Sequence, residues 1–196
     1  MKLYSFALVL ILTALTPATS AGPALAALPT AQPAAWIAHD VSIDLYNLPG
    51  HYSCDDLREK FRDVLLALGA RVDVTVLASR CELASRSPRV RLHFSMPELV
   101  ESASTRGAVV LDTAAAIIHL EPGYPASLTE ADCELMRQMK DKLIVPISRG
   151  VLSFNLACSA PPARGKSFSL SVRTFKSLDN SARVAEEREL TPKRLN

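Results

Sequence analysis

Four cysteines, spaced as two similar pairs, constrain the fold of this 196-residue chain more than any other feature. Cys54 and Cys81 are 27 positions apart, Cys133 and Cys158 are 25 apart, and 52 positions separate the two pairs. Zinc sites need closer cysteine ligands and redox sites use Cys-x-x-Cys, so neither chemistry fits this spacing. Three pairings are possible, and the spacing favours Cys54–Cys81 with Cys133–Cys158. Each structural disulfide of this kind stabilises the fold by about 3 kcal/mol.

The N-terminal segment predicts export, which agrees with disulfide formation. Met1 and Lys2 precede an uncharged apolar run from Leu3 to Leu15, which is short for a bilayer span, and small residues follow it. We expect a signal peptide over residues 1–21, and the alternative is an uncleaved anchor. The predicted localisation is periplasmic or secreted, with no membrane span after signal removal.

Two further segments are excluded from the predicted fold. Residues 22–35 are rich in Ala and Pro without a periodic apolar face, as in a linker. Residues 177–196 are polar and charged, with little to bury, and predict a disordered tail.

The two stretches bounded by cysteines resemble each other in sequence. They read CDDLREKFRDVLLALGARVDVTVLASRC from Cys54 and CELMRQMKDKLIVPISRGVLSFNLAC from Cys133. Aligned on the cysteines, apolar positions at helical spacing match, with one mismatch where Phe61 meets Lys140. We interpret this as a duplicated β-α-β-β unit over residues 36–105 and 106–176.

Capping and alternation patterns predict the helices and strands of each unit. Ser53 with Asp56, and Thr129 with Asp132, have the spacing of capping boxes, and Gly69 is placed to end the first helix. Period-two alternation at residues 89–96 and 168–175 predicts half-buried strands. Strands are also expected around three groups of apolar residues: Val41, Ile43 and Leu45; Val72, Val74 and Val76; and Leu152, Phe154 and Leu156.

The predicted fold is an α+β two-layer sandwich. Its sheet is mostly antiparallel, two helices pack on one face, and each unit holds its own disulfide. The pattern leaves open whether the two units share one sheet, and it leaves the oligomeric state open.

Linear catalytic motifs are absent from the chain. G-x-S-x-G, H-E-x-x-H, Walker and Rossmann patterns do not occur, so no catalytic residue, metal ligand or cofactor is predicted. A Ser-His-Asp set assembled in space, as in a periplasmic hydrolase, stays an alternative for the histidines at positions 39, 51, 93 and 119. A second alternative is weak metal binding by His39 and His119, if the first strands of the two units are neighbours.

Basic loop tips and tyrosines are the candidate binding residues. The candidates are Arg86, Arg89, Arg91, Arg164, Lys166, Tyr52 and Tyr124. The formal net charge is only +2 and aromatic residues make up 6% of the chain, so we expect no nucleic-acid partner. The sequence favours an exported, non-enzymatic protein that presents a binding surface to an envelope protein or an anionic envelope component. Ordinary solvated loops are the competing interpretation of the same residues.

Overall fold

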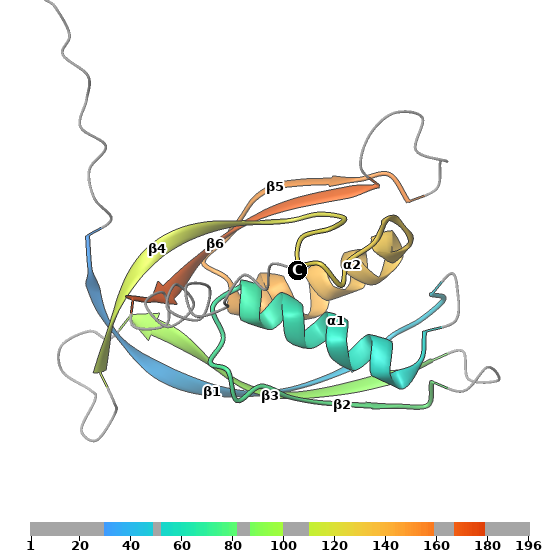
Figure 1. The fold of residues 1–196 in the computed structure, drawn as a ribbon, viewed down its shortest axis with the longest axis horizontal. Helices are drawn as coiled ribbons and strands as arrows, with labels where there is room; N and C mark the ends of the chain where they lie inside the picture. Colours follow the sequence, from blue (N-terminus) through green and yellow to red (C-terminus); the bar gives the residue numbers. More distant parts are fainter. Residues whose placement is uncertain (1–29, 49–51, 82–86, 100–109, 159–166, 179–196) are drawn as a thin grey trace, which may run out of the picture.

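The protein folds as one six-stranded antiparallel sheet with two helices on its concave face, as seen in a computed structural model (Figure 1). The structure describes residues 30–48, 52–81, 87–99, 110–158 and 167–178. The strands are β1 (Gln32–Asp44), β2 (Thr75–Ser79), β3 (Arg89–Leu99), β4 (Val110–Leu120), β5 (Val151–Leu156) and β6 (Phe168–Ser177). Their order in the sheet is β2-β3-β1-β4-β6-β5. The predicted fold class is confirmed.

A short strand pairing joins the two halves of the sheet. β1 pairs with β3 from Ala34 to Asp44, but it pairs with β4 only from Gln32 to Ala35. Beyond this junction β1 and β4 diverge, and the sheet curves around the helices (Figure 1). Both halves therefore belong to one sheet and follow the order strand, helix, strand, strand. The origin of the halves in an internal duplication stays a prediction.

The first helix, α1 (Cys54–Ala67), begins and ends as its sequence predicts. The Asp56 amide donates to Ser53 Oγ, and the Ser53 amide donates to the Asp56 carboxylate, which completes the capping box. Gly69 follows the helix with a φ of +98°, a conformation that glycine adopts without steric cost. The apolar face of α1, including the fully buried Phe61, packs into the core.

The second helical segment is irregular where a regular helix was expected. It runs through η1 (Glu130–Asp132), α2 (Cys133–Met139), the π-helical η2 (Lys140–Ile144) and α3 (Val145–Ile147). Pro146 explains part of this irregularity, because proline has no N–H for an α-helical hydrogen bond and its ring crowds the preceding turn. The π segment begins at Lys140, the position where the two halves mismatch in sequence.

Three predicted boundaries need correction. β1 begins at Gln32, so the last four residues of the expected linker belong to the sheet, and Ala34 and Ala35 are fully buried there. β6 continues to Ser177, the first residue of the expected tail. Val72 is 67% exposed and precedes β2, because the chain is still turning from α1 into the sheet. Residues 1–29 and 179–196, with the expected signal peptide and most of the tail, lie outside the described residues.

Candidate functional site

The two disulfides lie where each helix begins and the following strand has just ended. Cys54 bonds to Cys81 and Cys133 bonds to Cys158, with Cα–Cα distances of 5.3 and 5.4 Å. The predicted pairing is confirmed. A helix rises about 1.5 Å per residue and a strand about 3.3 Å, so a short returning strand brings the second cysteine back to the helix start.

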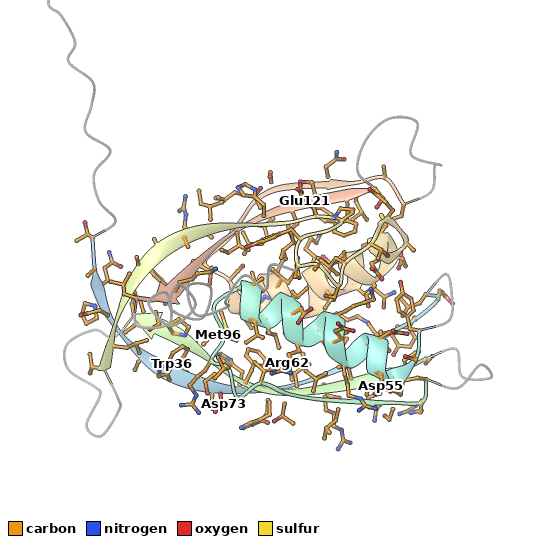
Figure 2. The ribbon with its side chains drawn as sticks, viewed as in Figure 1. Trp36, Asp55, Arg62, Asp73, Met96 and Glu121 are labelled. Atoms are coloured by element: carbon orange, nitrogen blue, oxygen red, sulfur yellow. A yellow bond between two sulfur atoms is a disulfide. The ribbon has the colours of Figure 1, made fainter. Side chains whose placement is uncertain are left out.

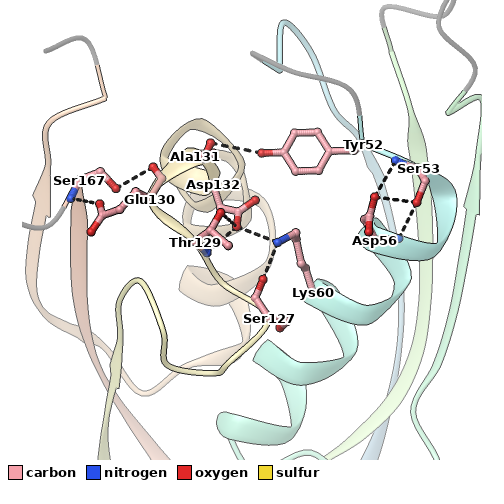
Figure 3. Close-up of polar contacts among 10 residues, drawn as sticks. All are labelled: Tyr52, Ser53, Asp56, Lys60, Ser127, Thr129, Glu130, Ala131, Asp132 and Ser167. Atoms are coloured by element: carbon pink, nitrogen blue, oxygen red, sulfur yellow. Dashed lines mark hydrogen bonds and ion pairs between the residues drawn. The ribbon is translucent and has the colours of Figure 1, made fainter. Parts of the chain in front are cut away.

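A buried polar cluster joins α1 to the turn before α2 (Figure 3). Lys60 Nζ lies 2.8 Å from Asp132 Oδ2 and also donates to the Ser127 carbonyl. The Asp132 carboxylate accepts from the Thr129 amide at 2.7 Å and from its hydroxyl at 2.8 Å, which confirms the second capping box. The Asp132 side chain is 1% exposed and that of Lys60 is 13% exposed. The cluster satisfies its own charges and positions the two helices.

Tyr52 and Glu130 extend this cluster on either side (Figure 3). The Tyr52 hydroxyl donates to the Ala131 carbonyl at 3.4 Å. Burial, together with the nearby Asp132 carboxylate, raises the pKa of Tyr52 above its ordinary value of 10.0. Glu130 accepts from the Ser167 amide at 2.7 Å, which ties the start of the second helical segment to β6. These contacts give Tyr52 a place in the internal packing.

The candidate binding residues do not gather into one patch in the described part of the chain. Arg89 makes two hydrogen bonds to the Asp44 carboxylate, at 2.7 and 2.9 Å, and this pairing lowers the pKa of Asp44. Arg91 is exposed on the convex face of β3, and Tyr124 is 50% exposed. The other three, Arg86, Arg164 and Lys166, lie outside the described residues. A binding role for the set stays a prediction.

Three histidines have polar neighbours on the sheet. His93 Nδ1 lies 2.8 Å from Asp40 Oδ1, with both side chains exposed, and His119 Nδ1 lies 2.9 Å from Ser171 Oγ on the same convex side. His39 faces the concave side, where its ring stacks on Phe94. The fourth, His51, lies outside the described residues. The His93–Asp40 pair lies on an open sheet face, which offers a substrate little enclosure.

The idea that His39 and His119 approach each other is wrong for this fold. β1 and β4 are neighbours, but they run antiparallel and pair only near their N-terminal ends. From that junction the two histidines lie in opposite directions along the sheet and on opposite faces. Among the described residues, no group of three or more His, Cys, Asp and Glu side chains could hold a metal ion.

A hollow lies between α1 and β2. It has a volume of about 600 Å³ and is lined by Arg58, Glu59, Arg62, Asp63, Val74, Thr75 and Val76. β2 is a terminal strand of the sheet, so the hollow runs beside a sheet edge that no described strand pairs with. Figure 2 shows Arg62 on α1 between Asp55 at one end of the helix and Asp73 before β2. Sequence reasoning missed this site because nothing in the pattern of β2 indicates that it ends the sheet.

Comparisons with known proteins give no relative: no family model, curated protein or solved structure matches this chain. Within the described ranges, none of the helices has both the length and the apolar composition needed to cross a bilayer. Function is therefore inferred from the hollow, the sheet edge of β2 and the charges beside them.

Proposed function

We propose that this chain is an exported, non-enzymatic protein that binds an extended segment of a partner protein as an added strand next to β2. The observation that carries this proposal is an uncharged sheet edge lying beside the hollow of about 600 Å³ under α1. In strand addition, main-chain hydrogen bonds supply affinity and adjacent pockets supply specificity.

The edge of β2 lacks the usual devices that protect a terminal strand. Such edges normally carry lysine, proline or a bulge that prevents pairing with another chain. β2 reads TVLAS, and its register with β3 is continuous from Thr75 to Ser79. At alternate residues its N–H and C=O groups point away from β3, because an antiparallel strand bonds one neighbour with only half of these groups.

The hollow provides room for the side chains of an added strand. Alternate side chains of that strand would point towards α1, where Arg58 and Arg62 lie beside Glu59 and Asp63. Charges of both signs favour a partner segment that itself carries both signs. Val74 and Val76 provide an apolar base for the same contacts.

The convex side of this edge supports the same binding mode. Leu77 is 61% exposed on β2 and is directly opposite Arg91 on β3. A strand added to β2 brings its other side chains next to Leu77 and within reach of Arg91. The proposal therefore gives Arg91, one of the candidate binding residues from the sequence, a role beside the edge of β2. The two disulfides support an oxidising, exported setting for the partner.

Site-specific crosslinking tests the proposal. A photo-crosslinking amino acid replaces Leu77 in the tagged protein, which is irradiated in its own envelope, and captured proteins are identified by mass spectrometry. The control replaces Ile117, which is 54% exposed on β4 inside the sheet. We expect a reproducible partner from position 77 alone, attached through one contiguous peptide. Equal capture from both positions, or no capture above background at position 77, would contradict the proposal.

A further inference from the structure

A second, smaller hollow lies on the concave side of the sheet, beside the end of α3. It has a volume of about 170 Å³. β3 contributes Met96 to Glu98, the chain after η2 contributes residues 146–149, and β6 contributes Thr174 and Phe175. Figure 2 places Met96 towards the end of α1 opposite Asp55, so this hollow is distinct from the one beside β2.

Two opposite charges line this hollow without neutralising each other. Glu98 comes from β3 and Arg149 from the turn before β5, and no ion pair joins them within the part of the chain that the structure describes. The Arg149 amide donates to the Arg173 carbonyl at 3.0 Å, and its guanidinium lies over the Phe175 ring. The first contact positions the backbone of Arg149, and the second orients its side chain. The hollow therefore has a cation on one wall and a carboxylate on another, and both side chains reach solvent.

One buried polar atom without a hydrogen-bond partner lies at the same hollow. Among the described residues, three buried side-chain atoms lack a hydrogen-bond partner: His39 Nε2, Ser127 Oγ and Ser148 Oγ. Ser148 lines the hollow, whereas His39 does not line it and its Nε2 is paired with the Glu98 carboxylate at 3.3 Å. Buried polar atoms are nearly always paired, so Ser148 Oγ indicates a missing polar partner at this hollow.

We infer that this hollow binds a small zwitterion of the α-amino acid class. Its carboxylate pairs with Arg149 and accepts from Ser148 Oγ, and its ammonium group pairs with Glu98, which has His39 behind it. The volume equals about six waters at ~30 Å³ each, which suits a molecule of about six heavy atoms. A dianion would be repelled by Glu98, and a simple amine would make no contact with the Arg149 guanidinium.

Titration of the isotope-labelled exported protein, followed by NMR, tests this inference with three probes. L-Alanine carries both charged groups, propionate lacks the ammonium group, and L-alaninamide lacks the carboxylate. We expect L-alanine to shift the amide signals of residues 96, 98 and 147–149 in a saturable way. Each analogue should bind at least about tenfold more weakly. Absence of saturable shifts with L-alanine, or equal affinity for all three probes, would overturn the inference.

Two variants test whether Glu98 binds the ammonium group of the ligand and whether Arg149 binds its carboxylate. In Glu98→Gln, L-alanine should bind no better than propionate does to the unmodified protein. In Arg149→Gln, L-alanine should bind no better than L-alaninamide does to the unmodified protein. Arg173→Gln, on the exposed convex side of β6, is the matched control and should leave all three affinities unchanged. The amide spectrum of each variant shows whether it is folded. Unchanged L-alanine affinity in a folded Glu98→Gln or Arg149→Gln protein would refute the charge assignment and the site with it.

Discussion

Lys60 and Asp132, 72 residues apart in the sequence, form a 2.8 Å ion pair between α1 and the turn before α2. Each helix is tied by a disulfide to its own half of the sheet, so this pair links the two halves through their helices. Thr129 and Ser127 supply further hydrogen bonds to the two charges. A buried pair with this support resists separation, because removing one partner leaves the other charge buried without compensation.

We expect Lys60→Met to lower the free energy of unfolding by about 3–5 kcal/mol, because Asp132 stays buried without its cation. Adding Asp132→Asn should recover part of this loss, because it removes the buried carboxylate that has lost its cation. Asp73→Asn, which breaks the exposed pair with Arg71, is the control and should have a small effect. Urea unfolding with both disulfides intact measures all three. A small loss in Lys60→Met would show that the pair does not connect the halves energetically.

We expect Cys81→Ser and Cys158→Ser each to lower the free energy of unfolding by about 3 kcal/mol, because their closed loops of 27 and 25 residues are similar. The losses should come mainly from the larger entropy of the unfolded chain. In each variant the partner cysteine is also replaced by serine, so that no free thiol remains. Urea unfolding of these two double variants measures the two losses. Peptide mapping without reduction that found Cys54 joined to Cys133 would contradict the pairing itself.

Local chemistry made much of this fold predictable. The capping boxes at Ser53–Asp56 and Thr129–Asp132 depend on residues three positions apart, so the sequence alone indicates them. Strand alternation identified the buried face of β3, where Val90, Leu92, Phe94 and Met96 all lie in the core. The disulfide pairing could be predicted from cysteine spacing because each disulfide joins two cysteines of the same half of the chain.

These local patterns could not predict contacts between segments that are distant in the sequence. Asp132 is predictable as a capping residue, but its ion pair with Lys60 depends on how two helices pack in the folded chain. The free edge of β2 depends on strand order, which alternation does not encode. The two hollows were missed for that reason. The π segment at Lys140 was visible only as a mismatch between the halves, without a structural cause.

The acid sensitivity of the α1 cap gives a third prediction. The hydroxyl and amide of Ser53 lower the pKa of Asp56 below its ordinary value of 3.8. A carboxyl whose pKa is lower in the folded protein stabilises it above the unfolded value, and this contribution disappears as pH falls through the folded value. Asp56→Asn should therefore cost about 1 kcal/mol at neutral pH and less below pH 3.8.

Urea unfolding of the unmodified protein and Asp56→Asn, at pH 7 and at about pH 3, measures this difference. Asp63→Asn, on the same helix but away from the cap, controls for general charge effects. Other carboxyls with lowered pKa, such as Asp44 and Asp73, titrate in every protein compared and cancel in the difference. A cost of Asp56→Asn that stays constant with pH would show that its charge does not support the cap.

Gly69 follows α1 and packs closely against β6 in the second half of the sheet, and this gives the last prediction. A Cβ added there would lie 2.6 Å from the Phe175 carbonyl oxygen, and φ is +98°. Phe175 is paired with Ala115 in the β4–β6 ladder, and Thr174 donates to the Leu68 carbonyl at 2.7 Å. The strand therefore cannot move away from a new methyl group without breaking hydrogen bonds.

We expect Gly69→Ala to lower the free energy of unfolding by more than about 2 kcal/mol, because backbone strain and the steric contact with β6 add together. Gly123→Ala is the matched control, since Gly123 has a φ of +86° and an added Cβ there meets nothing within 4 Å. That variant should lose only the backbone contribution, about 1 kcal/mol. Equal losses, measured by urea unfolding, would show that α1 can shift away from β6. A larger loss in Gly69→Ala would show that the end of α1 and β6 form one rigid contact between the halves.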